Sequence, residues 1–347
     1  MAFDAKREDY LRLCLRFTRE LGSGEATRMA DELAGFGRRF ANDRDSLPQT
    51  DADRAFHLVA EATDLIDYQL PFTPDDAQAQ ALMQRARNLL DEALSLDPQC
   101  HDAARMRQSG LSASVTDRLE WLLSHEGEVR ESCERQVGVI DDAIEGERGV
   151  MARNLAMRPL WRWMASEAAD ALVCGRNRQC LDICRRLLES DPDDNAGARL
   201  TATYALAKLE DEEGIDRLRA AWPRLSPHRG PEDPWSRLAD ISGAYKARRM
   251  QEAEMLLDAL LRDVPHAAAV LTRQADLPDG EFSRVILVPD SEDELTIATS
   301  EAIVLLQEGA EPTGRGALGA WVAAHVARRA PQEAAAAAAE QKGDNAR

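Results

Sequence analysis

Three cysteines are the first side chains of this sequence whose types and spacing suggest chemistry. Cys174, Cys180 and Cys184 fall within one predicted helical hairpin, where thiolates bind zinc or form redox pairs in other proteins. Zinc needs four ligands, usually from closely spaced pairs, whereas these spacings are six and four and no histidine is near in sequence. We therefore expect Cys180 and Cys184 to be buried between helices as small apolar side chains that hold no metal.

The acidic run at residues 191–195 has the carboxylate density of a calcium-binding loop. Its sequence is Asp-Pro-Asp-Asp-Asn, but it lacks the glycine and the distal glutamate of such a loop, because Ala196 and Ala202 stand at those positions. The run is also typical of a turn between helices, in which an Asp or Asn side chain caps the next helix. We predict the turn.

The remaining candidates for catalysis do not form a site in the sequence. None of the six histidines pairs with another at metal or catalytic spacing, and no serine, cysteine or threonine lies in a nucleophile-elbow pattern. Glycine-rich stretches at residues 22–24 and 314–316 lack the spacing and the preceding strand of a phosphate loop. The sequence therefore predicts a protein that is not an enzyme and that needs no cofactor.

One basic stretch runs against the acidic composition of the chain. Residues 148–186 carry eight arginines with two tryptophans among them, namely Arg148, Arg153, Arg158, Arg162, Arg176, Arg178, Arg185, Arg186, Trp161 and Trp163. Arginine beside tryptophan suits cation–π contacts and the recognition of carboxylates or phosphates. Two interpretations stay open: a face that balances acidic neighbours within the fold, or a site for an acidic partner, a ligand or a nucleic acid.

Composition limits the other functional classes. The chain has 347 residues, 44% of them hydrophobic, and a net charge of −19, which repels phosphate backbones and makes nucleic-acid binding unlikely. It contains no run of 18 apolar residues, so we expect no membrane insertion, and residues 1–10 lack the apolar core of a signal peptide. These features, with six scattered cysteines, predict a cytoplasmic protein with reduced thiols.

Amphipathic helices must position whatever site exists, because apolar residues recur at three- and four-residue steps along nearly the whole chain. Glycine, proline, aspartate and asparagine separate the periodic segments. A short β-branched piece at residues 282–288 stands apart from this pattern. The helices are expected at residues 4–21, 25–40, 51–68, 75–96, 116–144, 151–173, 178–189, 195–209, 211–222, 235–247, 250–263, 291–308 and 316–329.

Three of these segments share a repeated pattern: residues 86–98, 180–192 and 253–265. Each opens on a small residue (Ala86, Cys180 or Ala253), places a larger apolar residue four positions later, and ends on a proline. The small residue allows a second helix to approach closely, the apolar residue shares its face, and the proline stops the helix. Such units bury their faces only against neighbouring units, so the pattern favours stacked repeats.

The pattern resembles the second helix and exit turn of a tetratricopeptide repeat. It is more closely similar to uncharacterised bacterial repeat proteins distantly related to the suppressor-of-tumorigenicity family, through residues 94–103, 158–159, 175–176, 191–195, 264–266 and 316–321. The resemblance implies an all-α fold, a helical-hairpin solenoid of degenerate tetratricopeptide-like repeats. We expect an N-terminal helical region at residues 1–74, the solenoid at 75–275, a helical hairpin at 276–330 and an Ala-rich tail at 331–347 that frays because it has nothing to pack against.

The resemblance also implies where a partner binds. In tetratricopeptide proteins the first helices of the repeats line a concave groove that holds a peptide or protein. The corresponding residues here are Arg162, Ala169, Arg199, Thr203, Trp235, Ser242, Tyr245 and Lys246. A clamp for a C-terminal carboxylate is not expected, because Ala169, Thr203 and Ser242 replace its asparagine. Arg162 and Arg199 are predicted to face a shared groove and to bind an acidic peptide, and the identity of the partner stays open.

Overall fold

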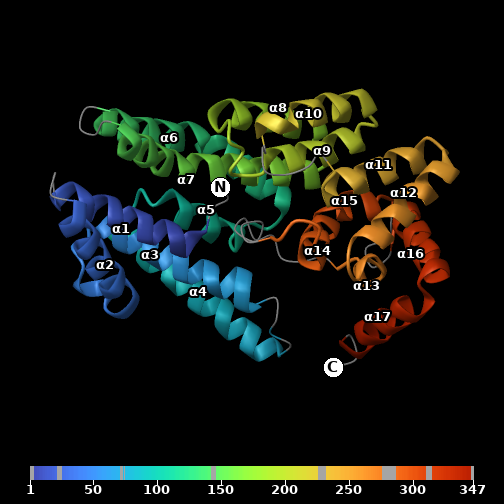
Figure 1. Ribbon diagram of the computed structural model, residues 1–347, viewed down its shortest axis with the longest axis horizontal. Helices are drawn as coiled ribbons and strands as arrows, with labels where there is room; N and C mark the ends of the chain where they lie inside the picture. The colour runs from blue at the N-terminus through green and yellow to red at the C-terminus, as the bar shows by residue number, and fades with distance from the viewer. Residues whose placement is uncertain are drawn as a thin grey trace. The chain divides into compact units, whose positions relative to one another are not determined.

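The protein is described by a computed structural model that covers residues 4–21, 26–70, 73, 75–141, 146–225, 232–275, 287–309 and 315–344. Most of these residues are helical and none of them forms a strand (Figure 1). The all-α class predicted from the apolar period is therefore confirmed for the described part of the chain. The β-branched piece predicted at residues 282–288 lies almost wholly outside it.

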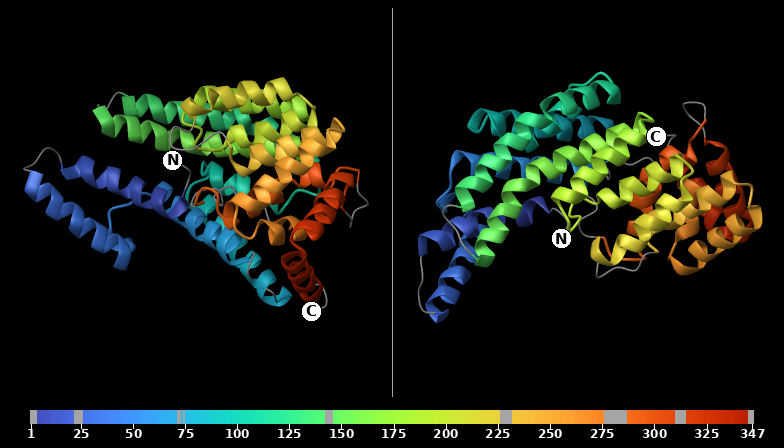
Figure 2. Two further views of the ribbon diagram at one scale, coloured as in Figure 1. Left: turned by 45° about the vertical axis from the view of Figure 1, so that its right-hand side comes forward. Right: turned by 90° about the horizontal axis from the view of Figure 1, so that it is seen from above.

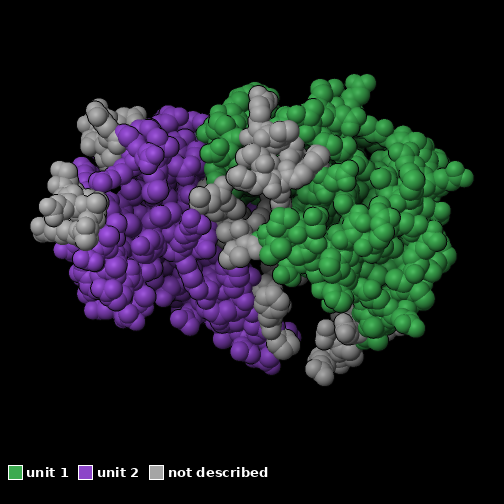
Figure 3. Space-filling model, viewed as in Figure 1, with its two compact units in different colours: residues 1–2, 165–347 green, residues 3–164 purple. Residues whose placement is uncertain are grey.

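The chain forms two compact units, unit 2 at residues 3–164 and unit 1 mainly at residues 165–347 (Figure 3). Their division falls inside the long helix α7, Gly146–Val173. The units differ from the predicted segments, because the helices on either side of residue 74 pack on one core and belong to the same unit.

Apolar clusters join the first helices of unit 2. Phe56, Val59 and Leu90 belong to the core between α3 and α4, and Leu13, Phe36 and Leu47 form a smaller cluster beside α1 and α2. The helix α6 runs without a break through both of its glycines. The elements of unit 2 before α7 are α1 Ala5–Leu21, α2 Ala26–Asn42, η1 Arg44–Ser46, α3 Asp51–Thr63, η2 Asp64–Gln69, α4 Asp76–Leu96, α5 His101–Ser109 and α6 Val115–Asp141.

Unit 1 is built around α9, in which every residue from Ala198 to Ala207 is buried. The helices α8, α10 and α11 pack against it, and α12 packs against α11 (Figures 1 and 2). The elements of unit 1 after α7 are α8 Asn177–Ser190, α9 Ala198–Lys208, α10 Glu212–Leu225, α11 Pro234–Lys246, α12 Met250–Asp263, α13 Ala267–Arg273, α14 Glu292–Glu301, α15 Ile303–Leu306, α16 Ala317–Arg329 and α17 Pro331–Asp344.

The small and apolar residues of the repeated pattern are buried, as close packing of helices requires. The small residues Ala86, Cys180 and Ala253 are at most 1% exposed, and the apolar residues that follow them by one turn are also buried. Gly175 ends α7 with a φ of 72°, a left-handed conformation that glycine adopts without strain. These burials are the ones expected where helices pack closely.

The structure of residues 331–344 contradicts the sequence prediction that the C-terminal tail frays. Residues 331–344 form α17, which packs against α13 and α16. Ala334 and Ala337 are 5% and 2% exposed, and Glu333 accepts a hydrogen bond of 3.1 Å from the backbone N–H of Ala269. The alanine run therefore does have a packing partner, which the sequence did not reveal because α13 lies some sixty positions earlier in the chain.

Candidate functional site

Arg162 of α7 lies at the centre of a buried ion cluster in unit 2, with 1% of its side chain exposed. Its guanidinium donates from Nη1 to Glu8 at 2.9 Å and from Nε to Asp102 at 2.6 Å. Glu8 also accepts hydrogen bonds from Arg12 at 2.8 Å and from Arg158 at 3.0 Å. The prediction that Arg162 points into an open groove is wrong, because the fold itself supplies its carboxylates.

The charges of this cluster hold one another ionised. Burial alone would raise the pKa of Glu8, but Arg162, Arg12 and Arg158 together hold it well below its usual range. The pKa of Asp102 is lowered in the same way, since Arg162 outweighs the effect of burial. Burial by itself would lower the pKa of Arg162, but Asp102 and Glu8 outweigh this effect and raise that pKa above its ordinary value. The cluster is thus a set of mutually dependent buried ions.

Helical spacing brings the cluster together. Glu8 and Arg12 are four residues apart on α1, as are Arg158 and Arg162 on α7, so each pair shares one helix face. Asp102 adds a carboxylate from the first turn of α5. The Arg12 guanidinium also lies over the ring of Phe56, 4.0 Å from its centroid. The cluster therefore ties α1, α3, α5 and α7 to one another within unit 2.

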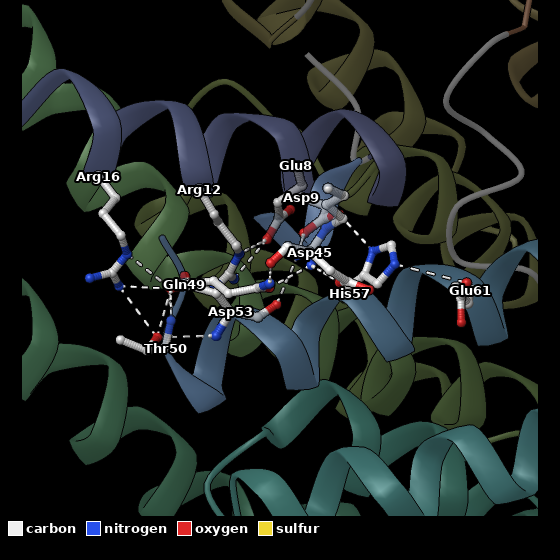
Figure 4. A network of polar contacts seen from close by, with 11 residues as sticks. Glu8, Asp9, Arg12, Arg16, Asp45, Gln49, Thr50, Asp53, His57 and Glu61 are labelled. Atoms are coloured by element: carbon white, nitrogen blue, oxygen red, sulfur yellow. Dashed lines mark hydrogen bonds and ion pairs between the residues drawn. The ribbon is translucent and has the colours of Figure 1, made fainter. Parts of the chain in front are cut away.

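A second polar network surrounds Asp9, the neighbour of Glu8 (Figure 4). Asp9 accepts two hydrogen bonds from Arg44, at 2.6 and 2.8 Å, and one of 2.8 Å from Nδ1 of His57. Burial would raise the pKa of Asp9, but the bonds to His57 and Arg44 lower it. Nε2 of His57 is directed at Glu61, at 3.8 Å, so both ring nitrogens face a carboxylate.

The same network continues to the start of α3. Thr50 caps this helix by accepting from the backbone N–H of Asp53, and Asp53 accepts in return from the backbone N–H of Thr50. Arg16 binds the Asp53 carboxylate at 2.8 Å. No group of three or more His, Cys, Asp or Glu residues within the described ranges could hold a metal ion. The network and the cluster tie the elements of unit 2 to one another.

Arg199 and Thr203, predicted to line the groove, are interior residues of unit 1. Arg199 is 6% exposed and pairs with Asp194 at the turn before α9. Thr203 is 2% exposed and donates to the backbone oxygen of Arg199 at 2.8 Å. The prediction that Arg199 faces an open groove is therefore wrong as well. Asp191 in the same turn accepts from Asn195, which confirms that the acidic run forms a turn.

Three of the other predicted residues, Trp235, Ser242 and Lys246, belong to a surface that the structure brings together, which we call the α9–α11 face. It consists of Tyr204 and Lys208 on α9 and Trp235, Ser242 and Lys246 on α11. Each helix contributes residues four or seven positions apart, which share one side of a helix. Three of the five were predicted from the sequence, and Tyr204 and Lys208 were missed.

The α9–α11 face is covered by residues 291–308 of the same chain, which we call the α14–α15 segment (Figures 1 and 2). The Tyr204 hydroxyl donates to the backbone oxygen of Ala298 at 2.7 Å, and Lys208 donates to that of Val304 at 3.1 Å. Trp235 donates from its indole nitrogen to Glu301 at 2.6 Å. The face therefore holds a helix through both its backbone and its side chains.

Charge complementarity marks one end of this contact. Glu308 pairs with Lys208 at 2.7 Å and with Lys246 at 2.8 Å. Burial would raise the pKa of Glu308, but the two ammonium groups lower it. Tyr245, another predicted groove residue, is half-buried and packs instead on Trp321 of α16, with 5.2 Å between ring centroids.

The Arg- and Trp-rich stretch at residues 148–186 does not form a single basic surface. Trp161 and Trp163 are 5% and 1% exposed, and Arg158 and Arg162 belong to the buried cluster. On α8, Arg185 is exposed but pairs with Asp182 and Glu189. A face balanced by acidic neighbours describes these arginines better than a site for an external anion.

The cysteines occupy the places predicted for small apolar side chains. Cys180 and Cys184 are 0% and 1% exposed within α8, and none of the six cysteines forms a disulfide. The prediction that these two thiols are buried between helices is confirmed.

Comparison of the chain with protein-family models, with curated proteins and with solved structures gives no match. Within the described residues, no helix is both long enough and apolar enough to span a bilayer.

Proposed function

We propose that this protein is a non-catalytic helical scaffold that binds a helical segment of a protein partner on its α9–α11 face. The observation that carries the proposal is the contact with the α14–α15 segment. Tyr204 and Lys208 bond to backbone oxygens of that segment, and a backbone oxygen can accept such a bond whatever side chain its residue carries. A face with these donors has the means to recognise a helix laid along it.

Tetratricopeptide-like repeats would give this scaffold its architecture. Support comes from the buried small residues Ala86, Cys180 and Ala253 and from the pairing of α9 with α10 and of α11 with α12. The predicted cytoplasmic location and the similarity to the bacterial repeat proteins belong to the same proposal. A nucleic-acid partner is disfavoured by the net charge of −19 and by the burial of Trp161, Trp163 and Arg162.

Site-specific crosslinking in native cell extract tests the proposal. A photoreactive amino acid replaces Lys246 on the α9–α11 face of the full chain, and in a control chain it replaces Lys6, a lysine on α1 that is 69% exposed. We expect a covalent adduct with a protein partner at position 246 that is absent at position 6. Adducts at position 6 alone, or at neither position, would rule out this face as the binding site.

A further inference from the structure

We infer that the partner competes with the α14–α15 segment and presents the same chemistry: a helix with a small apolar face and two carboxylates seven residues apart. The inference rests on the proposed function, because it names the partner class and the regulation of the α9–α11 face. In this arrangement the segment is an intramolecular occupant, and a partner helix must displace it.

The apolar half of the description comes from the buried side of the segment. Leu295, Ala298, Ala302 and Leu305 follow one another at steps of three and four residues, and each is at most 1% exposed. Two of the four are alanines, and the Tyr204 hydroxyl reaches the backbone oxygen of one of them, Ala298. Small side chains therefore allow the backbone of the bound helix to approach α9, and a competing helix needs them at equivalent positions.

The polar half comes from Glu301 and Glu308. Glu301 accepts from the indole of Trp235, whose side chain is fully buried, and Glu308 lies between Lys208 and Lys246. The chain has only four lysines, and two of them meet at this one carboxylate. Such a concentration of ammonium groups in a protein of net charge −19 favours an acidic helix over a neutral or basic one.

The contact with the α14–α15 segment leaves a buried hydroxyl of the α9–α11 face without a hydrogen bond among the described residues. Ser242 lies seven residues after Trp235 and four before Lys246, so its side chain is on the covered side of α11. It is 0% exposed, and its hydroxyl has no hydrogen-bond partner among the described residues. A buried hydroxyl without a partner lowers the stability of the contact. A partner helix with an acceptor at this point would satisfy the hydroxyl and displace the segment.

Competition by a labelled peptide tests the inference in the full-length chain. The probe is a fluorescent synthetic peptide of residues 290–309, and binding is followed by anisotropy. The Glu301→Gln/Glu308→Gln chain weakens the internal occupant while it leaves the α9–α11 face intact. In the matched control chain, Glu292→Gln/Asp293→Asn removes two charges from the start of α14, where Glu292 pairs with Arg273 of α13 and Asp293 is exposed.

The expected affinities follow from competition between the peptide and the α14–α15 segment for the α9–α11 face. Because apparent affinity rises as the face becomes free, the peptide should bind the Glu301→Gln/Glu308→Gln chain about tenfold or more tightly than it binds the wild type or the control. A peptide with both glutamates changed to glutamine should lose most of this binding. Amide exchange should also quicken in α14 and α15 of the first variant while α9 stays protected. If α9 loses protection too, the single Glu308→Gln chain replaces the double variant.

Equal affinity of the peptide for all three chains, or equal binding of the peptide without carboxylates, would overturn the inference. Crosslinking at position 246 separates this failure from failure of the proposed function. A partner adduct at position 246 without peptide competition would leave the binding face valid and its internal occupant irrelevant. Peptide competition without any adduct would show an exchangeable segment on a face that binds no protein in the extract.

Discussion

At the scale of single residues, two buried carboxylates lie in opposite electrostatic surroundings. Glu8 in unit 2 faces three guanidinium groups, which keep its pKa low despite complete burial. Asp191 in unit 1 accepts hydrogen bonds from Asn195 but has the carboxylate of Asp194 nearby, and burial raises its pKa to about 6. A buried charge is stabilised by what surrounds it, so the two should respond differently to mutation and to pH.

Replacement of Glu8 by glutamine should destabilise unit 2 strongly. The change leaves Arg12, Arg158 and Arg162 without a carboxylate that they share, and removal of one partner from a buried ion pair costs about 3–5 kcal/mol. Urea unfolding followed by circular dichroism measures the loss. Glu131→Gln is the control, because that side chain is 76% exposed and should contribute less than about 1 kcal/mol. Similar losses for the two variants would contradict the role assigned to the cluster.

Asp191→Asn should remove a pH dependence of stability between about pH 4 and pH 6. The raised pKa of about 6, against an ordinary value of 3.8, means that the folded state keeps a proton that the unfolded state has already lost. Folded wild-type protein therefore loses stability as pH rises through this window, by about 3 kcal/mol in all. We measure the unfolding free energies of the wild type and the variant from pH 4 to 7. As pH rises, the stability of the wild type should fall relative to that of the variant, so that the difference narrows or reverses in the variant's favour. The exposed neighbour Asp193, changed to asparagine, should leave the wild-type pH dependence in place.

At the scale of helices, the apolar period of the sequence was enough to predict most elements. The helices predicted at residues 250–263 and 75–96 occur as α12 and α4 with ends that differ by at most one residue. Local signals, such as the proline after the repeated pattern, carry this information. Side-chain burial was also predictable where it depends on helix register, as at Cys180 and Ala253.

The partners of these helices were not predictable, because they depend on residues far apart in sequence. Arg162 meets Glu8, 154 positions earlier, and Tyr204 meets Ala298, 94 positions later. Nothing in the local sequence of Glu8 distinguishes it from an exposed glutamate at the start of a helix. The predicted groove residues Trp235 and Lys246 share one side of α11, but the segment that contacts them belongs to the chain itself.

Packing between helices predicts the effect of a larger side chain at Ala253 on α12. This residue is 0% exposed at the start of the repeated pattern, and α12 packs against α11. Ala253→Leu should overpack this contact and cost about 1–3 kcal/mol in a urea melt. Met255→Leu on the same helix, at a position 65% exposed, should change stability little. No loss at Ala253 would mean that the close approach of helices lies elsewhere in the pattern.

At the scale of the whole molecule, charge opposes the compact state. The chain carries 62 acidic and 43 basic side chains, for a net charge of −19 at pH 7. Many surface carboxylates are offset by nearby arginines, but the surplus repels itself across distances that pairwise contacts do not cover. Buried clusters such as that of Glu8 are screened little by salt, whereas this long-range repulsion is screened strongly.

Added sodium chloride should therefore raise the melting temperature at neutral pH. Between about 0.01 M and 0.5 M salt, the screening length falls from roughly 30 Å to below 8 Å, so repulsion among surplus carboxylates fades while buried pairs persist. Differential scanning fluorimetry at pH 7 should show a rise of several degrees. The control is the same titration near pH 4.8, the sequence pI, where there is no net repulsion to screen and salt weakens only the surface pairs. There the melting temperature should stay level or fall. A fall at pH 7 would mean that exposed ion pairs stabilise this fold more than its net charge destabilises it.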